Sequence, residues 1–312
     1  MRKKIAIALI GLLSAVSANA QYDVHFSNYE LVEAYYNPAT VGKETNLNVV
    51  GAYAMQMMGF ENAPRTMYVG ADIALPILGG KHGVGAQILN DQIGFFTNQS
   101  FSLQYAFHTP MFGGQLSAGV NVGFISEGFD GSKVEFVDGE RDDAFPTGSV
   151  KGSALDLGAG VHYSYRDFYA GVGAKHLTQP KVLLGETNEL QIDASYFFMA
   201  GGNIRLKNPL LSVQPSVMLL TDATAFRADL MAKLCYQNDG RKLVGGLGYS
   251  PGNSVTALVG GTFHGIELGY AFEWYTSALG AKSGSHELTV SYKTDLNLFK
   301  KGKNKHKSIR YL

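Results

Sequence analysis

Hydrophobic and polar residues alternate along most of this chain, in segments of about ten residues separated by turn residues. In the segment 226–236, the even-numbered positions are apolar, whereas the odd-numbered positions include Arg227, Asp229 and Lys233. The same alternation recurs in four further segments, 101–108, 116–124, 266–275 and 286–293. Alternation with a period of two is typical of a β-strand that has one face in an apolar environment and the other in a polar one.

Roughly fourteen such segments can be counted by this pattern. They begin near Asn46, Arg65, Gly83, Gln99, Gln115, Ser153, Asp167, Leu190, Leu210, Ala225, Lys242, Ser254, Gly265 and Ser285. After Gln21 there is no apolar run of about 18 residues, so no transmembrane helix is predicted. Lipid cannot bond free backbone groups, and a closed sheet leaves none. The pattern therefore predicts an all-β chain that forms a transmembrane antiparallel β-barrel of about 14 strands. A secreted β-sandwich is the alternative.

The lengths of the connections agree with a barrel whose two chain ends lie in the periplasm. In such barrels the even-numbered connections are short periplasmic turns, and the odd-numbered connections are longer extracellular loops. The even-numbered connections fall near 76–82, 109–114, 165–167, 207–209, 238–241 and 264–265, and all are short and rich in turn residues. The two longest connections, 126–152 and 177–189, are odd-numbered.

The N-terminus predicts export. Three cations at positions 2–4 precede an apolar run from Ile5 to Val16, and Ala18-Asn19-Ala20 fits a cleavage site before Gln21. We therefore expect a signal peptide over residues 1–20 and an N-terminal segment over 21–45. That segment is aromatic and polar, and it is expected either to plug the lumen or to lie along the periplasmic rim. The barrel is expected over 46–295, followed by a tail over 296–312.

The composition narrows the possible functions. The single Cys excludes an internal disulfide framework, and the formal net charge of the whole chain is zero. Six bases crowd the tail: Lys300, Lys301, Lys303, Lys305, Lys307 and Arg310. Export argues against nucleic acid as a partner, so the tail is either a solvated end or an element that docks onto a periplasmic protein.

The sequence offers little for chemistry. Gly248–Gly252 fits G-x-S-x-G, but it lies between two predicted strands, where a hairpin turn is expected instead of a nucleophile elbow. The charges on the polar strand faces predict interior ion pairs, with a transport filter or catalytic site as the alternative. The acidic stretch 126–152 is expected to be a surface loop, with a Ca²⁺ site as the alternative. The histidines lack metal-site spacing. We predict no catalytic residue, no metal and no cofactor.

Several short motifs together resemble the PorP/SprF family. His25–Tyr29 followed by Tyr36–Ala39 and a glycine resembles the N-terminal signature of that family, here formed by Phe26, Ser27, Tyr29, Asn37, Pro38, Ala39 and Gly42. Gly83–Gly85, Asn90–Gly94 and Tyr105–Phe107 resemble its early strands, and Ser285–Tyr292 resembles its last strand. These blocks span nearly the whole mature chain in the order of the family.

The resemblance implies an outer-membrane component of the type IX secretion system of Bacteroidota, which in gliding relatives exports adhesins. It implies a non-enzymatic protein that is embedded in outer-membrane lipid. Its implied partners are periplasmic ring and peptidoglycan-binding proteins such as PorK, PorN and PorE, and exported surface proteins that some members anchor. A porin or transporter that conducts small solutes is the alternative function.

Overall fold

The computed structural model describes residues 23–77, 80–133, 146, 148–186, 188–276 and 284–295. The predicted signal peptide and the predicted basic tail lie outside these residues. The strands of the main sheet are β1 (Leu47–Met55), β2 (Arg65–Ile77), β3 (Gly80–Ile93), β4 (Phe96–Met111), β5 (Gly114–Asp130), β6 (Ser149–Tyr165), β7 (Phe168–Lys175), β10 (Ser195–Gly202), β11 (Ile204–Arg205), β12 (Leu211–Thr221), β13 (Phe226–Asn238), β14 (Arg241–Ser250), β15 (Ser254–Phe263), β16 (Ile266–Tyr275) and β17 (Ser285–Thr294).

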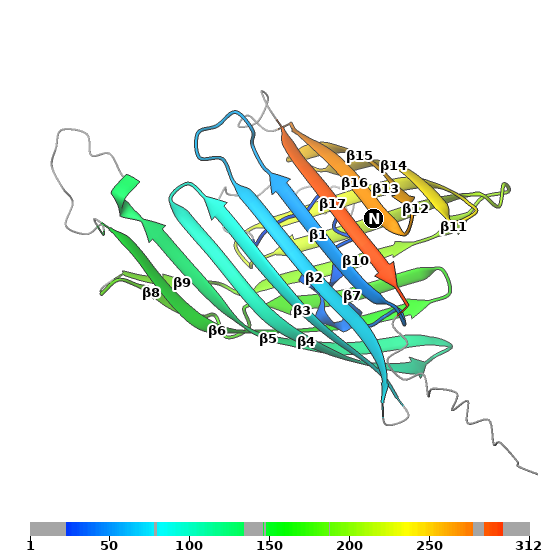
Figure 1. The fold of residues 1–312 in the computed structure, drawn as a ribbon, viewed down its shortest axis with the longest axis horizontal. Coiled ribbons are helices and arrows are strands. Elements are labelled where there is room, and N and C mark those ends of the chain that lie inside the picture. Colours follow the sequence, from blue (N-terminus) through cyan, green and yellow to red (C-terminus); the bar gives the residue numbers. More distant parts are fainter. Residues whose placement is uncertain are drawn as a thin grey trace, which may run out of the picture.

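Fourteen of these strands form a closed antiparallel barrel (Figure 1). Each strand pairs with its neighbours in sequence, and β17 closes the sheet by pairing with β1 from Leu47↔Thr294 to Met55↔His286. β10 bridges the two halves, because it pairs with β7 on one side and with β12 on the other. The two-residue strand β11 pairs with β12 beside this ring. The predicted all-β barrel of about 14 strands is therefore confirmed, and the alternative sandwich with free sheet edges is wrong.

The strand starts agree with the prediction to within a few residues, with one exception. The eighth barrel strand was expected near Leu190 but begins at Ser195, because residues 181–191 form a separate hairpin. This hairpin consists of β8 (Lys181–Leu184) and β9 (Asn188–Gln191). Val182 and Leu184 of β8 pack against Ile125 and Phe129 of β5, which explains why alternating residues here do not join the barrel.

The connections differ between the two ends of the barrel. We call the end at which β1 begins and β17 ends the terminal end, and the opposite end the loop end. Three turns at the terminal end consist of two residues that both have positive φ: Phe112-Gly113, Asp239-Gly240 and His264-Gly265. This is the tight hairpin geometry that matches the twist of antiparallel strands. The connection from β5 to β6, which includes the one-turn helix η2 (Gly131–Lys133), and the connection from β7 to β10 both lie at the loop end.

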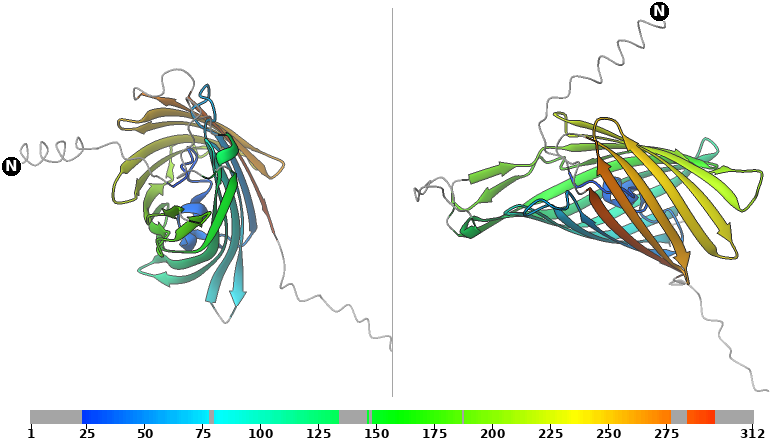
Figure 2. Two further views of the ribbon diagram at one scale, coloured as in Figure 1. Left: turned by 90° about the vertical axis from the view of Figure 1, so that its left-hand side faces the viewer. Right: turned by 90° about the horizontal axis from the view of Figure 1, so that it is seen from above.

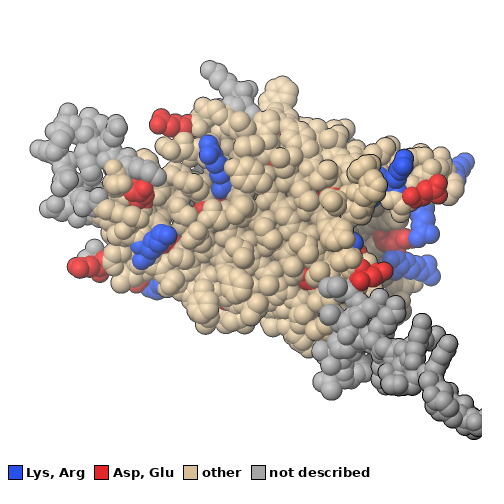
Figure 3. All heavy atoms as spheres, in the orientation of Figure 1, with Lys and Arg blue, Asp and Glu red and all other residues tan. Residues whose placement is uncertain are grey.

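The outward face of the barrel is apolar. In β4, the outward side chains Phe101, Leu103, Tyr105 and Phe107 are exposed, whereas the alternate side chains are buried in the lumen. Figure 3 shows that charged side chains gather near the two ends of the visible face and leave its middle free of charge. In the part of the chain that the structure describes, no helix is both long and apolar enough to span a membrane.

A charge on this outward face is expected to destabilise the barrel in a depth-dependent way. Val259 lies in the middle of β15 with 60% of its surface exposed, and Phe263 ends the same strand on the same face. Val259→Arg should cost about 2–4 kcal/mol, because the guanidinium must enter the lipid, whereas Phe263→Arg at the rim should cost about 0–1 kcal/mol. Urea unfolding in lipid vesicles measures both values. Equal costs for the two variants would contradict the transmembrane placement.

Candidate functional site: the occupied lumen

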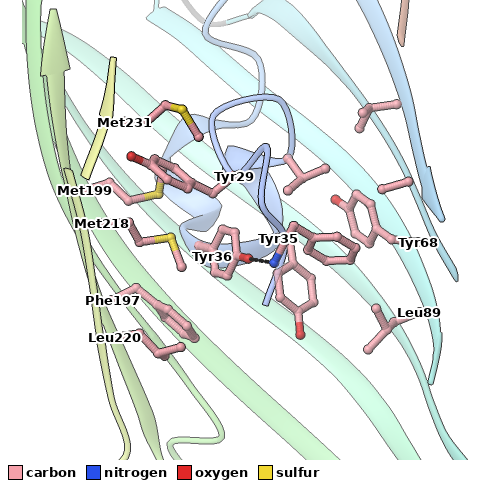
Figure 4. Packing of buried hydrophobic residues seen from close by; sticks show 14 residues of the cluster. Tyr29, Tyr35, Tyr36, Tyr68, Leu89, Phe197, Met199, Met218, Leu220 and Met231 are labelled. Carbon is pink, nitrogen blue, oxygen red and sulfur yellow. Dashed lines mark hydrogen bonds between the residues drawn. The ribbon is translucent and has the colours of Figure 1, made fainter. Parts of the chain in front are cut away.

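Residues 23–44 lie inside the barrel, as the two views in Figure 2 show. They include two short helices, α2 (Glu33–Tyr36) and η1 (Pro38–Thr40), in which the Asn37 side chain accepts a hydrogen bond from the Ala39 N–H. The aromatic side chains of this lumenal segment meet apolar side chains of the barrel wall (Figure 4). The cluster consists of Phe26, Tyr29, Val32, Tyr35, Tyr36, Val50, Ala52, Tyr68, Leu89, Phe197, Met199, Met218, Leu220 and Met231. The lumen therefore has a packed core in place of an open channel through its centre.

The aromatic rings of the lumenal segment are fixed by contacts with each other and with the wall. The Tyr36 hydroxyl accepts a hydrogen bond from the Phe26 N–H at 2.9 Å, so the start of the segment is held by the end of α2. The Tyr36 ring lies 5.1 Å from the ring of Phe197 in β10, and the Tyr35 ring lies 5.4 Å from that of Tyr68 in β2. Aromatic pairs at such distances contribute about 0.5–1.5 kcal/mol each beyond the area that they bury.

The predicted signature residues all lie in this segment and face the barrel wall. Phe26 and Tyr29 are part of the cluster, and the Tyr29 hydroxyl lies 2.8 Å from Ser216 Oγ of β12. The Ser27 N–H donates to Glu287 in β17, and the Asn37 amide donates to the Val161 carbonyl in β6. The residues of the predicted signature therefore help to fill the lumen of this chain.

The remaining signature residues occupy places that tolerate little bulk. Pro38 and Ala39 are buried in η1, and a Cβ atom on Gly119 of β5 would overlap the backbone between them. Gly42 has a φ of 66°, which favours glycine, and its N–H donates to Asp72 Oδ2 at 2.8 Å.

Glycines of the barrel wall provide the space for the lumenal segment. A Cβ atom on Gly83 of β3 would overlap the Val41 carbonyl group, and one on Gly173 of β7 would overlap that of Tyr36. These glycines come from separate strands, so only the closed barrel brings them to one surface.

Buried ion pairs connect the inward strand faces with each other. Arg227 of β13 lies 2.7 Å from Glu273 of β16 and 3.0 Å from Asp229 of its own strand. Asp229 also lies 3.2 Å from His25 Nε2 of the lumenal segment. The predicted interior ion pairs are therefore present, and they include Arg227 and Asp229, which the alternation placed on the polar face of their strand.

Further ion pairs fix the lumenal segment along its length. Lys233 of β13 lies 2.6 Å from Glu30, and Lys293 of β17 lies 2.8 Å from Glu44. Within the segment, Lys43 lies 3.0 Å from Glu33. Burial alone would raise the pKa of Glu33, but Lys43, His162 and Lys233 together outweigh the effect of burial and lower this pKa.

A four-residue network holds the start of the lumenal segment. Asp23 lies 2.7 Å from Lys175 and 3.3 Å from His176, and His176 lies 3.1 Å from Asp156. The two cations outweigh the effect of burial and hold the pKa of Asp23 well below its usual range. Burial alone would lower the pKa of His176, but the hydrogen bonds to Asp156 and Asp23 raise it to about 9. The network therefore combines two carboxylates with one lysine and one histidine.

Removal of the Glu287 carboxylate is expected to loosen the start of the lumenal segment. Its two oxygens accept the backbone N–H groups of Ser27 and Asn28 at 2.6 and 2.9 Å. Glu287→Ala leaves both donors buried without an acceptor, which costs about 1–3 kcal/mol for each. Faster protease cleavage near residue 27 would measure the loosening, and Glu189→Ala in the exposed β8–β9 hairpin is the control. Cleavage at the unchanged rate would refute the role of Glu287.

The G-x-S-x-G stretch forms a hairpin turn between β14 and β15. Ser250 is the last residue of β14, and its hydroxyl donates to the Ala228 carbonyl at 3.0 Å. His25 and Asp229 line the same void as Ser250, but this void measures about 10 Å³. Such a volume suits a single water molecule and not a substrate.

The residues that the structure describes form no metal centre. Among residues 23–77, 80–133, 146, 148–186, 188–276 and 284–295, no group of three or more His, Cys, Asp or Glu side chains could hold a metal ion. Of the stretch 126–152, residues 126–130 extend β5 and residues 149–152 begin β6, so the expected loop is shorter at both ends. Most of its acidic residues lie outside the described residues.

The comparison with known protein families agrees with the barrel and its lumenal segment. The family described as "Type IX secretion system membrane protein PorP/SprF" matches residues 18–292. The chain belongs to the PorP/SprF family. This match spans the lumenal segment and all barrel strands up to Tyr292. The PorP/SprF chain is therefore an outer-membrane β-barrel of the type IX secretion family, and its lumenal segment lies within the matched region. Among curated proteins, none matches the sequence.

Solved structures with a similar shape are distant from this PorP/SprF chain in sequence. A deletion mutant of the TodX monoaromatic hydrocarbon channel is 12% identical, covers 91% of this chain and 98% of its own, and has a TM-score of 0.48. A FadL homologue from Pseudomonas aeruginosa is 12% identical over 80% and 89% of the two chains, with a TM-score of 0.45. Omp33 from Acinetobacter baumannii is 8% identical over 81% and 100%, with a TM-score of 0.46. The barrel assignment therefore depends on the strand pairing of the chain itself.

Proposed function

We propose that this protein is a non-enzymatic, non-conducting subunit of the type IX secretion machinery that anchors or organises other components at the outer membrane. The observation that carries the proposal is the lumen filled by residues 23–44, which are bonded to Glu287, Lys233 and Lys293 of the wall. A solute channel needs a continuous wet path, and the aromatic cluster stands in that path. A barrel with a packed interior is suited to serve as a rigid platform in the membrane.

The orientation follows from the connections. The terminal end faces the periplasm in this proposal, because tight two-residue turns are typical of the periplasmic side of such barrels. Cleavage of the signal peptide before Gln21 leaves the lumenal segment as the start of the mature protein. The basic tail of residues 300–310 then leaves the barrel on the periplasmic side, where ring and peptidoglycan-binding proteins of the PorK, PorN and PorE type are its partners. Exported surface proteins would meet the loop end.

A crosslinked pull-down from outer membranes tests the anchoring role. The intact protein is expected to capture periplasmic ring or peptidoglycan-binding proteins that mass spectrometry identifies. Deletion of residues 300–312 should reduce this capture by about tenfold or more, since several charge contacts of up to about 1 kcal/mol each are lost together. A variant with the six tail bases replaced by Gln keeps the length of the tail and should show the same loss.

The outcomes of this experiment distinguish docking through the tail from docking through the barrel. If both tail variants capture the same partners as the intact protein, docking through the tail is wrong. If the intact protein captures no secretion component, the anchoring role itself is wrong. Heat-modifiable migration in gels shows in each case that the barrel has folded.

A further inference from the structure

A cavity of about 430 Å³ lies at the loop end of the barrel. It is lined by the ends of β3, β4 and β5, by the chain between Leu190 and Ser195, by the first residues of the lumenal segment, and by His176 and Asp222. The volume falls in the range of small-molecule sites, which hold about 300–1,000 Å³. Of the residues that line this cavity, only Asp23 and His176 belong to the contacts described above for the lumenal segment.

The lining carries an excess of negative charge. Five carboxylates line the cavity: Asp23, Asp91, Glu127, Asp193 and Asp222. The charge of Asp23 is balanced by Lys175 and His176. The others have at most neutral donors within the described chain, where Asp91 accepts from the Thr66 hydroxyl at 2.6 Å and Asp193 from the Gln191 amide at 3.1 Å.

Asp222 and Glu127 also contribute to the excess of negative charge in the lining. Asp222 accepts hydrogen bonds from the Thr224 hydroxyl and from the backbone N–H groups of Thr224 and Ala225, all of which are neutral donors. Glu127 is only 6% exposed and lines the cavity, and no hydrogen bond or ion pair of its carboxylate is found among the described residues. His176 on the same wall acts on Glu127 electrostatically, but its ring nitrogens already pair with Asp23 and Asp156. A buried carboxylate without a partner is costly, so a cation inside the cavity would stabilise it.

The arrangement of the lining indicates which kind of cation fits. No group of three acidic or histidine side chains converges closely enough to hold a metal ion within the described residues. The carboxylates are instead spread around a wall that also contains the apolar side chains of Ile93, Phe96 and Leu190. An organic cation matches this mixture, because its N–H groups reach several acceptors while its carbon atoms contact the apolar wall.

We propose that this cavity binds an ammonium or guanidinium group on a short apolar stem, with Glu127 as its principal ion-pair partner. Two sources offer this chemistry, namely a free aliphatic amine and a lysine or arginine side chain of a protein segment. The site does not depend on the anchoring role, because it is inferred from the charge balance and the lining of the cavity alone.

Isothermal titration calorimetry of the purified full-length protein in detergent, which measures the affinity for each probe, tests the proposal. The probes are capped lysine and capped arginine, namely N-acetyl-lysine N-methylamide and its arginine equivalent, together with 1,5-diaminopentane. The neutral control ligand is N-acetyl-norleucine N-methylamide, which keeps the apolar stem. Saturable binding is expected for at least one of the cations and not for norleucine. Tighter binding of a capped residue would identify a protein segment as the source, and tighter binding of the diamine would identify a free amine.

Three variants assign the binding to the cavity. Glu127→Gln keeps the size of the side chain and removes its charge, so affinity should fall by about tenfold or more. Asp193→Asn, a variant of a less buried residue, should weaken binding by about two- to fivefold. Glu189→Gln is the matched control, since this glutamate is 52% exposed, pairs with Lys181 and does not line the cavity. It should leave the affinity unchanged.

Three results would overturn the proposal. The first is an absence of saturable binding by any of the organic cations. The second is binding that Glu127→Gln does not change while gel migration shows a folded barrel. The third is binding of Ca²⁺ that the organic cations cannot displace, which would make the cavity a metal site.

Discussion

A barrel that lacks residues 23–44 is expected to conduct ions steadily in a planar bilayer, whereas the intact protein is expected to remain closed. Deletion removes the aromatic side chains that fill the lumen, including Tyr29 and Tyr36. The wall residues that they contact would then line a water-filled space, where hydration replaces the lost partners of Lys233 and Glu287. Barrels of this size or slightly larger are wide enough to leave an aqueous channel when nothing fills them.

A point variant tests the same expectation without removing any residue. Gly173→Val places side-chain atoms where the Tyr36 carbonyl lies, so the lumenal segment cannot seat fully. Gly245→Val is the control, because a Cβ atom there meets nothing within 4 Å. Intermittent conductance is expected for the first variant and none for the second. A closed barrel after deletion of residues 23–44, or steady conductance of the intact protein, would show that this segment is not what closes the lumen.

Replacement of Arg227 by methionine is expected to cause a large loss of stability. The guanidinium lies between Asp229 and Glu273 in the lumen, where the two acidic residues are buried and the arginine side chain is 12% exposed. Methionine preserves much of the volume but leaves two buried carboxylates with one cation fewer, which costs about 3–5 kcal/mol. Urea unfolding followed by the fluorescence of Trp274 measures this loss.

Two further variants separate the charge from the packing at this position. Arg205→Met removes an exposed pair with Asp167, in which the two atoms lie 3.4 Å apart, and should cost less than about 1 kcal/mol. The triple variant Arg227→Met, Asp229→Asn, Glu273→Gln removes the stranded charges and should recover much of the lost stability. If Arg227→Met costs no more than Arg205→Met, the interior network does not stabilise the barrel.

The barrel could be predicted closely from sequence because lipid imposes a strict rule on each strand. Every second side chain must be apolar across the membrane, so the alternation in residues 101–108 and 226–236 marks strands without any knowledge of their partners. The rule fails where alternation has another cause. Residues 181–191 alternate because β8 buries Val182 and Leu184 against β5, and sequence alone does not separate such a hairpin from a barrel strand.

The lumenal site was much less predictable. The aromatic and polar residues of the N-terminal segment are compatible with a plug and with a position along the rim, and both were open at the level of sequence. The plug is distinguished from the position along the rim by the wall glycines that face the N-terminal segment, such as Gly83, Gly119 and Gly173. These lie on three separate strands, and many other glycines of the chain occupy turns. The ion partners depend in the same way on strand register, as the pair of Arg227 with Glu273 illustrates.

The charged cavity at the loop end had no sequence signal of its own. Glu127 was grouped with the acidic residues of the stretch 126–152, which were expected to be solvated. The structure instead extends β5 to Asp130, so the side chain of Glu127 points inward. A carboxylate near the end of a strand points into the lumen or away from it depending on whether it stands at an odd or an even position of that strand. This alternation applies to the residue only if the strand extends that far, and the sequence does not show where the strand ends.

A photo-crosslinker at position 36 in living cells tests most directly whether the N-terminal segment occupies the lumen. Benzoylphenylalanine in place of Tyr36 lies next to Phe197 of β10, because the two native rings are 5.1 Å apart. Irradiation followed by mass spectrometry should yield an intramolecular crosslink between the peptide around residue 36 and the peptide that contains residue 197. Crosslinks from position 36 to other proteins, with none to the barrel wall, would contradict the account.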